Sequence, residues 1–399
     1  MIVSVNGNIL RCKEVTMFRN TYVEIDNSAI EHNARLLGET FPHKYNIAVI
    51  KGNAYGHGYG IVPALVKGGM NAFAVSNLSE ALEVRKYDEE HPVIMLQPVP
   101  VAFFEDCAAH NISVCVNDRD TFEEIYKSGL KLKLQFKVNC GMNRLGYTDG
   151  TLLKADIDKA EASDNLTVEG LFSHFHTSGL TDTEYAADRT RFEKITAGID
   201  LTKIPMVHID KTQTILLHDT PSYCNGARFG ISLYGFTSVY PYDNSLKGRL
   251  LQKRRDIRNK LNHVEPSKAL KNYDLKTAFT LFSEVIQVNK IASGAYVGYG
   301  LLHKAERPEY IAVIDTGYSD GIGRGRRGTN VMINGRKYPI VGEVGMGMCQ
   351  VLVDETVKKH DKVTVLGGGI SIRGIASAIG TTTYETLTRI NTSIDRRYI

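Results

Sequence analysis

A lysine that directly follows a short apolar run is the first residue of this chain that could do chemistry. The run Ile47–Ile50 leads into Lys51, and a glycine-rich segment, Gly52–Gly58, comes next. A run of this length is typical of a strand buried on both faces, so we predict Lys51 at the carboxyl end of a parallel strand, where α/β folds keep their active sites. Burial lowers the pKa of a lysine and makes its amine a nucleophile suited to Schiff-base chemistry. The alternative, from this segment alone, is a lysine that ends a strand and points into water.

Further polar residues fall at or just after the carboxyl ends of later predicted strands. Because the carboxyl ends of parallel strands meet at one end of a barrel, we expect these side chains to converge there, and the loops after strands seven and eight are where barrels bind phosphate. Each residue taken singly could be structural instead. The residues are Asn139–Arg144 after the fifth strand, His174 and His176 after the sixth, His208 and Thr212 at the seventh, and Arg228, Gly230 and Ile231 in the eighth.

The elements that position these residues repeat along the chain. A strand over 21–26 and a helix capped by Ser28 come first. Eight strand-like segments then alternate with amphipathic helical patterns such as 78–87, 119–128 and 182–198. A doubly wound sheet usually has five or six strands, so eight favour a closed (β/α)8 barrel of the TIM type. The expected strands are 47–51, 72–76, 93–97, 113–117, 133–139, 167–175, 205–209 and 227–234.

The composition of the chain changes after the predicted barrel strands. Residues 246–276 are dense in charge, which favours a solvated insertion over a nucleic-acid or lipid-binding patch, because acids are mixed with the bases and aromatics are sparse. From residue 277 onward, strand-like segments alternate with glycine-rich turns, and a closing helix is expected over 372–391. We therefore expect a barrel domain over 20–245, a charged linker over 246–276 and a C-terminal all-β domain over 277–399.

Composition narrows the class of protein. The net charge of +4, from 48 basic and 44 acidic residues, is too balanced to suggest nucleic acid as a partner. Six cysteines without a CxxC pair argue against a disulfide framework or a zinc site, and for a reducing compartment. No apolar run approaches the ~20 residues of a membrane span, and the first residues lack the pattern of a signal peptide. We expect a cytoplasmic protein that binds no metal, nucleic acid or membrane.

The lysine segment resembles the pyridoxal phosphate (PLP) attachment motif of alanine racemases, and the resemblance extends over residues 20–399 apart from the charged insertion. It implies a PLP-binding barrel, a β domain and a homodimer whose active sites, shared across the interface, act on a small amino acid. The further matching segments, in the family's order, are FKVNCGMNRLGY (136–147), SHFHTSG (173–179), RFGISLYG (228–235), VGYG (297–300), GYSDGIGR (317–324), INGRKYPIVGEV (333–344) and TTTYETL (381–387).

The resemblance implies two catalytic residues. Lys51 would hold PLP as a Schiff base and act as one proton-transfer base, and Tyr299, from the partner subunit, would be the other. Racemisation removes the Cα proton from one face and returns a proton to the opposite face, so acid/base groups are needed on both sides of the Cα. PLP acidifies that proton as an electron sink.

Other roles are carried over onto matching positions. Arg228 would face the pyridine nitrogen with support from His208, and His174 would lie against the cofactor ring. Arg144 would contact the phenolic oxygen of the cofactor and the substrate carboxylate, oriented by Lys137, which is often carbamylated in the family. The remaining assignments are Tyr55, Thr212, Gly230, Ile231 and Tyr384 for the phosphate, Met346 (or Met348 if the register slips) for the substrate, and Tyr318 as a supporting residue.

Several positions depart from the family pattern, and they weaken an assignment to alanine alone. Asn139 and Cys140 replace the usual Asp and Thr beside Lys137. The other departures are Asp210 and Lys211 in place of small and amide residues, Gly179 and Glu343 in place of an Asp–Arg pair that narrows the substrate corridor, and Gly347 in place of an Asp.

The leading hypothesis is a racemase that supplies D-alanine for cell-wall peptide, and a racemase of serine or of a broader amino-acid set is the second. A decarboxylase of related architecture is disfavoured because the chain lacks a GGGFP-like turn and a CESGD-like segment. A non-catalytic PLP carrier would resemble the barrel alone, whereas this chain continues through a second domain that contains Tyr299.

Overall fold

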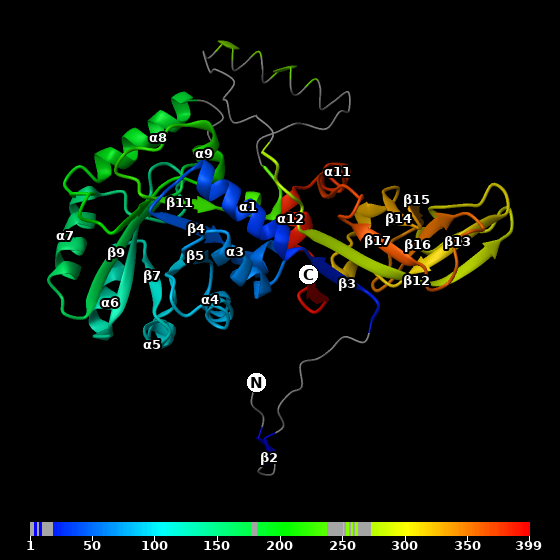
Figure 1. Ribbon diagram of the computed structural model, residues 1–399, viewed down its shortest axis with the longest axis horizontal. Coiled ribbons are helices and arrows are strands. Elements are labelled where there is room, and N and C mark those ends of the chain that lie inside the picture. Colours follow the sequence, from blue (N-terminus) through cyan, green and yellow to red (C-terminus); the bar gives the residue numbers. More distant parts are fainter. Residues whose placement is uncertain are drawn as a thin grey trace. The chain divides into compact units, whose positions relative to one another are not determined.

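The computed structural model describes residues 19–176, 182–237 and 273–399, together with the short strands β1 (Ser4–Val5) and β2 (Asn8–Ile9) and a few positions between 250 and 261. The chain divides into two compact units (Figure 1). One unit comprises Asp26–Ala278, and the other joins Met1–Ile25 to Phe279–Ile399. Most of the expected charged linker, 246–276, lies outside the described residues.

Eight parallel strands form the inner layer of the first unit, in the order β10-β9-β8-β7-β6-β5-β4-β11. Backbone hydrogen bonds of 3.1 Å from Asn225 to Val207 and from Arg228 to Asp210 join the segments of β10 and β11 and close the ring. The predicted TIM-type barrel is thereby confirmed. The strands are β4 (Tyr45–Val49), β5 (Ala72–Val75), β6 (Val93–Met95), β7 (Ile112–Val116), β8 (Leu132–Val138), β9 (Leu166–Ser173), β10 (Met206–His208) and β11 (Gly226–Phe229).

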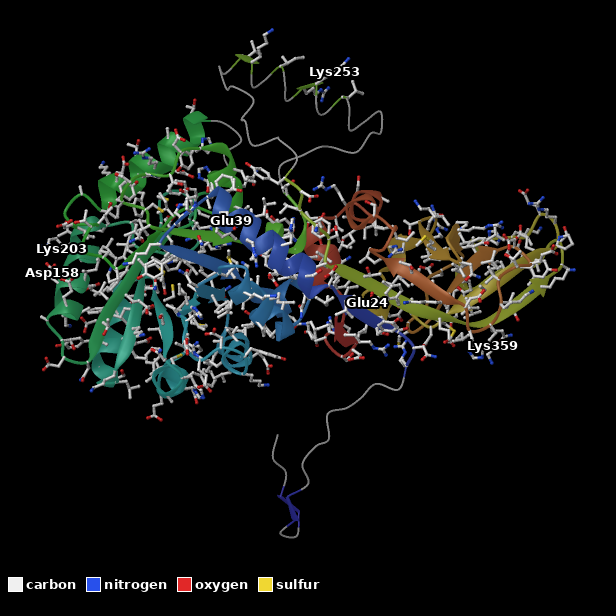
Figure 2. The ribbon with its side chains drawn as sticks, in the orientation of Figure 1. Glu24, Glu39, Asp158, Lys203, Lys253 and Lys359 are labelled. Atoms are coloured by element: carbon white, nitrogen blue, oxygen red, sulfur yellow. The ribbon has the colours of Figure 1, made fainter. Side chains whose placement is uncertain are left out.

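Helices lie outside this ring of strands (Figure 1). The outer face of α7 (Gly150–Glu161) and the turn before β10 carry exposed charged side chains, Asp158 and Lys203, which point away from the barrel (Figure 2). The helical segments are α1 (Asn27–Thr40), α2 (Lys51–Tyr55), η1 (Tyr59–Ile61), α3 (Val62–Lys67), α4 (Leu78–Arg85), η2 (Val101–Phe103), α5 (Phe104–Ala109), α6 (Arg119–Ser128), α7 (Gly150–Glu161), α8 (Asp182–Ile195), α9 (Thr212–Leu217) and η3 (Ile231–Tyr234).

Local signals explain where these helices begin and end. The Asp118 carboxylate accepts from the Thr121 N–H at 2.8 Å and caps α6, and Gly129, with φ +66°, ends the helix in the left-handed region. The predicted helix over 119–128 is confirmed. At α1 the prediction was wrong in detail: Asp26, rather than Ser28, is the capping residue, because its carboxylate accepts from the Ala29 N–H at 3.0 Å.

The first predicted strand does not belong to the barrel. β3 (Tyr22–Ile25) pairs antiparallel with β12 (Phe279–Ile291) and parallel with β18 (Asp395–Tyr398), so it is part of the second unit. The expected start of the barrel domain at residue 20 differs from this division. The reason is long-range: Val23 and Ile25 are completely buried in a sheet whose other strands lie more than 250 residues later.

The second unit contains a sheet that is antiparallel except for the β3–β18 pair and closes on itself through β12. The first half of β12 pairs with β17 and β3, and the second half, after a bulge between Val285 and Gln287, pairs with β13. The predicted all-β domain is confirmed. Its other elements are η5 (Tyr299–Leu301), β13 (Glu309–Ile314), η6 (Tyr318–Asp320), η7 (Arg324–Arg326), β14 (Asn330–Ile333), β15 (Arg336–Val341), β16 (Cys349–Val353) and β17 (Lys362–Leu366).

The expected closing helix over 372–391 is two short helices instead of one. α11 (Ile372–Ala378) and α12 (Thr383–Thr388) are separated at Gly380, which adopts φ +72°. The Thr382 hydroxyl then accepts from the Glu385 N–H at 3.2 Å and caps α12. A left-handed glycine followed by a capping threonine is a stop and start signal that the apolar pattern alone conceals.

Candidate active site

The chain leaves the first barrel strand through an unusual turn. β4 ends at Val49, and Lys51 opens a turn in which Gly52, Asn53 and Ala54 have φ values of 63°, 53° and 49°. Left-handed backbone costs about 1–2 kcal/mol for each residue that carries a Cβ, so the turn is strained. The Glu80 carboxylate accepts from the Gly52 N–H at 2.7 Å and stabilises it. Lys51 therefore lies beyond the strand rather than at its last position.

Cationic side chains gather at this end of the barrel. Residue Lys51 is open to solvent, yet the protein atoms around its amine lower its pKa, Arg144 lowers it further and Glu80 opposes the shift. Burial lowers the pKa of Lys137 to about 8, and the Arg144 and Arg228 charges act in the same direction. Burial and Arg228 likewise lower the pKa of Lys211 to about 8. Cations that disfavour one another's charge form a site that favours a bound anion.

Arg228 is held by an extensive buried network. Its guanidinium donates to the Ser173 carbonyl at 2.6 Å, to the Ile209 carbonyl at 2.9 Å and to the His208 Nδ1 at 2.7 Å. Because His208 accepts at Nδ1, its Nε2–H donates to the Gln135 Oε1 at 3.2 Å, which assigns the tautomer. Burial lowers the pKa of His208 well below its usual range and that of Arg228 only to about 10, so at neutral pH the histidine is neutral and the arginine charged.

His174 stands among the same charges. Burial lowers its pKa well below the usual range, and Lys211 contributes most among the neighbouring cations. The Lys211 ammonium donates to the Phe175 carbonyl at 3.3 Å, one residue further along. A neutral imidazole at this position can pack against an aromatic ring without adding another positive charge to the site.

Three predicted phosphate ligands do come together. The Thr212 hydroxyl accepts from the Gly230 N–H at 3.1 Å, and a Cβ added at Gly230 would lie 3.1 Å from the Tyr55 hydroxyl. Ile231, which follows at the start of η3, is buried. Glycine thus leaves open a cradle of hydroxyl and backbone groups between β10 and β11, which is the arrangement that suits a phosphate in a TIM-type barrel.

Lys137 is buried in the barrel below this mouth. Its amine donates to the Leu96 carbonyl at 3.0 Å and lies 5.2 Å from the centre of the Phe172 ring. The Cys140 thiol, one of the departures noted above, lies 2.9 Å from the Ser173 hydroxyl, which in turn donates to the Val138 carbonyl at 2.7 Å. The replacement is thus accommodated within the turn, and Lys137 keeps a depressed pKa of about 8.

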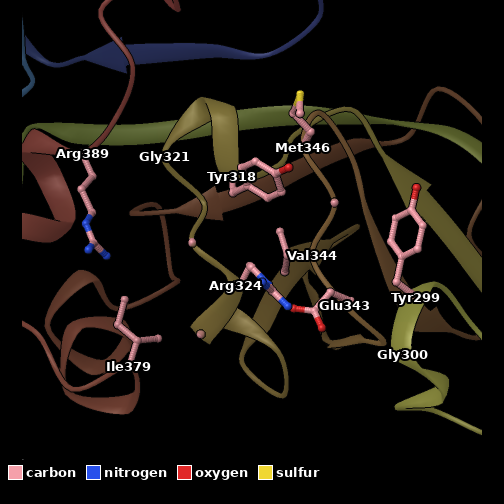
Figure 3. A pocket seen from close by; sticks show the side chains of 13 residues that line it. Tyr299, Gly300, Tyr318, Gly321, Arg324, Glu343, Val344, Met346, Ile379 and Arg389 are labelled. Atoms are coloured by element: carbon pink, nitrogen blue, oxygen red, sulfur yellow. The ribbon is translucent and has the colours of Figure 1, made fainter.

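The second unit contains a pocket of about 990 Å³. Tyr299, Tyr318 and Met346 line it, and the side chains of Arg324 and Glu343 point toward one another and form an ion pair in its wall (Figure 3). Tyr299 is 77% exposed and Met346 65% exposed. The departure at Glu343 therefore gives the local Arg324 a partner within the same unit.

Two other predicted residues of this unit are not part of that pocket. Tyr384 lies on α12 and is 38% exposed, and Met348 is 47% exposed. Neither is among the residues that line the pocket. The structure brings Tyr299, Tyr318 and Met346 together, and it separately brings Tyr55, Thr212 and Gly230 together. Gly179 lies outside the described residues.

Sequence reasoning missed two residues that shape the site. Glu80 binds the turn after Lys51, but its spacing after the helix cap Asn77 indicates only a helix start. Gln135 orients His208, and here a signal existed: Gln135 and Lys137 are two residues apart on β8, so both point to the same face of the strand. An inward-facing lysine on a barrel strand predicts a polar interior at the neighbouring position too.

Fold and site together define a class: a (β/α)8 barrel with cationic side chains at its mouth, followed by a β domain that carries its own pocket. The family description "Alanine racemase, N-terminal domain" matches residues 25–238, and "Alanine racemase, C-terminal domain" matches residues 278–398. The chain belongs to the alanine racemase family, whose members are isomerases that racemise amino acids.

Relatives match over the full length. The chain is 30% identical over 398 residues to an alanine racemase of Clostridium novyi (96% of each chain) and 32% identical over 380 residues to that of Geobacillus kaustophilus (92% of this chain, 91% of the other). A crystal structure of alanine racemase from E. faecalis superposes with a TM-score of 0.83 at 28% identity and covers 97% of this chain and 100% of that one. A histidine racemase from Leuconostoc mesenteroides (TM-score 0.80, 23% identity, 97% and 100% covered) shares the fold.

Within the described ranges, no helix combines the length and the apolar character needed to cross a bilayer.

Proposed function

We propose that this protein is a PLP-dependent racemase that interconverts L- and D-alanine, with Lys51 and Tyr299 as the two bases. The observation that carries the proposal is that the charges of Lys51, Lys137 and Arg228 act on one another at the end of the barrel where Gly230 leaves an open cradle. PLP is an anion with a phosphate and a phenolic oxygen, and amino-acid substrates add a carboxylate. The residues present fit such a group, because the cradle offers hydroxyl and backbone donors while the cations balance the charge.

When bound, PLP supplies an electron sink that makes the substrate Cα–H acidic. The chain's own residues do the rest. Lys51 has a lowered pKa, so a larger fraction of its amine is free to form the cofactor link and to take a proton from one face of the Cα. Arg228, held by three carbonyl groups and His208, stays charged at neutral pH and would face the pyridine nitrogen of bound PLP. Its charge would keep that nitrogen unprotonated, which would weaken the electron sink and limit transamination and other side reactions.

Tyr299 serves the opposite face of the Cα. Within its own unit Tyr299 lies on a surface with other exposed apolar side chains, Leu301 at 66% and Met346 at 65% exposure. An exposed apolar patch of this kind is typical of a protein–protein interface. We propose a homodimer in which this surface of one subunit completes the barrel site of the other, so that Tyr299 of the partner subunit faces Lys51.

Purified protein loaded with PLP tests the substrate. Incubation with L-alanine, L-serine and L-lysine, followed by chiral analysis of the products, should give the highest turnover for alanine. A higher kcat/KM for serine or lysine would favour the second candidate, a racemase of broader range. The Arg324–Glu343 ion pair supports this broader racemase as a second candidate. It gives the pocket beside Tyr299 a different arrangement of charges from the Asp–Arg pair of the family pattern. No racemisation of any of the three would overturn the proposed function.

Mixing two inactive variants tests the shared site. In Lys51→Ala and Tyr299→Ala subunits that exchange at random, about half of the dimers are mixed, and a two-fold dimer then holds one doubly damaged site and one intact site. About a quarter of all sites become intact, so activity should rise from near zero toward about a quarter of wild type. No recovery despite proven exchange would mean that both residues serve one subunit's site.

The reaction would take place in the cytoplasm and supply D-alanine for cell-wall peptide. The family membership supports this placement. The five cysteines of the described residues are buried and free of disulfides, which is typical of proteins in a reducing compartment.

A further inference from the structure

Arg19 makes side-chain hydrogen bonds to two carboxylates and two backbone carbonyls of the second unit, in segments next to the residues that line its pocket. Its guanidinium binds Asp315 in a bidentate manner, with Nε–Oδ2 and Nη2–Oδ1 distances of 3.2 Å and 3.0 Å. It also donates to Asp320 at 2.8 Å and to the Gly347 carbonyl at 3.4 Å. One side chain thus joins the end of β13, the turn of η6 and the turn that precedes β16.

The two carboxylates need this cation. The Asp320 side chain is only 4% exposed and that of Asp315 25% exposed, and both accept from the same guanidinium. The pKa of Arg19 is raised, chiefly by its hydrogen bond to Asp315 and then by that to Asp320. A buried carboxylate that loses its partner cation is strongly destabilised, so the arrangement of this turn depends on Arg19.

Asp320 passes this constraint to the pocket. Its Oδ2 accepts from the Gly317 N–H at 2.9 Å and fixes the start of the turn that carries Tyr318. The Tyr318 N–H donates to the Gly345 carbonyl at 2.9 Å. A Cβ at Gly317 would collide with the carbonyl oxygens of Gly345 and Met346, so the two turns are in close contact.

Ser319 makes a second connection between the turns. Its N–H and its hydroxyl both donate to the Met346 carbonyl, at 2.9 Å and 2.8 Å. Arg19 reaches the same turn from behind through the Gly347 carbonyl. Tyr318 and Met346, which face the pocket in Figure 3, therefore sit on two turns that are bonded to each other and held jointly by one guanidinium.

We propose that Arg19 is a positioning residue for the substrate pocket, which acts by holding the turns that carry Tyr318 and Met346. The inference rests on the proposed function, because it takes the pocket beside Tyr299 as part of the racemase site. Arg19 is not among the residues that line the pocket, so its effect should be on substrate binding and alignment more than on proton transfer.

Two readouts of Arg19→Met test this, one of them independent of activity. Hydrogen exchange, followed by mass spectrometry on the PLP-loaded protein, should show lost protection at 317–320 and 345–348. The KM for L-alanine should rise about tenfold, with a smaller fall in kcat, because the pocket walls lose their alignment. Arg19→Lys should partly restore both the exchange protection and the KM, since lysine keeps the positive charge but cannot bind a carboxylate in a bidentate manner. Arg336→Met, which breaks the exposed Arg336–Asp354 pair of the same unit, is the matched control and should change neither readout.

The double variant Arg19→Met/Asp320→Asn separates positioning from simple stability. Removing the unpaired buried carboxylate should restore much of the thermal stability. KM should stay high, because Gly347 and Asp315 still lack their hydrogen bonds to Arg19. If KM recovers together with stability, Arg19 is merely structural and the inference is wrong. An unchanged KM and unchanged exchange in Arg19→Met, with an active wild type, would also overturn it. If the wild type itself does not racemise alanine, the proposed function fails, and lost exchange protection would then support only the local constraint on the turns.

Discussion

The barrel mouth and the pocket of the second unit present functional groups in opposite ways. In the barrel, Arg228 and His208 are buried and fixed by hydrogen bonds to carbonyl groups and to Gln135. In the second unit, Tyr299 and Met346 are mostly exposed. Both regions carry residues that the family resemblance assigns to one active site.

This difference indicates how each half of the proposed active site is built. In the barrel, a network of hydrogen bonds offsets the cost of burying the Arg228 cation. Its functional groups are therefore ordered before any ligand binds. The second unit holds its turns from behind, through Arg19 and Asp320, and leaves the reactive side chains uncovered. A tyrosine has an ordinary pKa of about 10 and becomes an effective base beside cations, such as those at the barrel mouth, which is why we propose a partner subunit there.

Lys51 is where the comparison predicts the largest effect. Lys51→Ala should lower racemisation by more than about 10³-fold, because the cofactor link and one base are lost together. Borohydride treatment of wild type should fix the cofactor to Lys51, as seen by peptide mass spectrometry. Lys67→Ala, at an exposed lysine of the same unit, is the control and should keep full activity. Labelling of a different lysine would contradict the assignment.

Tyr299→Phe tests the exposed half of the site. Exchange of the Cα proton should be blocked on one face while Lys51 still exchanges the other, so deuterium uptake from heavy water should become strongly dependent on which enantiomer is supplied. Single-turnover exchange measured by mass spectrometry gives both rates. Tyr296→Phe, at a neighbouring exposed tyrosine, should behave like wild type. Equal losses for L- and D-alanine would count against two bases.

Lys137 tests the buried half. We predict a carbamate on Lys137, since a pKa of about 8 leaves some free amine to react with carbon dioxide and the product adds a negative charge beside Arg144. Lys137→Ala should lose about 10- to 100-fold in activity, part of which added acetate or formate restores. Lys133→Ala, at a partly exposed position on the same strand, is the control. An unmodified Lys137 by intact mass at ambient carbon dioxide would refute the modification.

Lys211 should make PLP-free protein less stable in a pH-dependent way. Its folded pKa of about 8 lies below the ordinary value of 10.5, so the protonated side chain is disfavoured in the fold, fully so below pH 8. Stability should therefore rise as pH increases from 8 to 10.5. Lys211→Asn should raise the free energy of unfolding by about 2 kcal/mol at pH 7, after allowance for partial exposure, and the gain should shrink toward pH 10. Urea unfolding at both pH values checks this, and an equal gain at both would contradict it.

The smallest effect is expected where an ion pair is exposed. Breaking the Arg324–Glu343 pair with Glu343→Gln should leave the free energy of unfolding nearly unchanged, because Arg324 is 68% exposed. In the barrel, Asp188 is fully buried between His176 and Arg191, and Asp188→Ala should cost about 3 kcal/mol. Chemical denaturation of both variants measures the loss in the free energy of unfolding that each substitution causes. Equal costs would remove the contrast between the two regions.

The sequence alone determined which residues could act and where the main elements lie. Apolar runs that end in polar residues located Lys51, Arg144 and Arg228, and the strand count led to the barrel, because these signals are local and the strand ends of a parallel barrel must converge. The segment 119–128 carried its own cap and stop signals, so its bounds were predicted correctly.

Only the tertiary structure decided the contacts that join distant parts of the chain. β3 pairs with β12 in the second unit and not with the barrel strands. Strand pairing depends on which apolar residues are buried together across the whole chain, and no local pattern encodes this. Glu80 beneath the turn at Lys51 and Gln135 beside His208 became visible only through hydrogen bonds between elements. Arg19 gave no signal at all in its own segment, since its partners lie about 300 residues further along and meet it only in the folded unit.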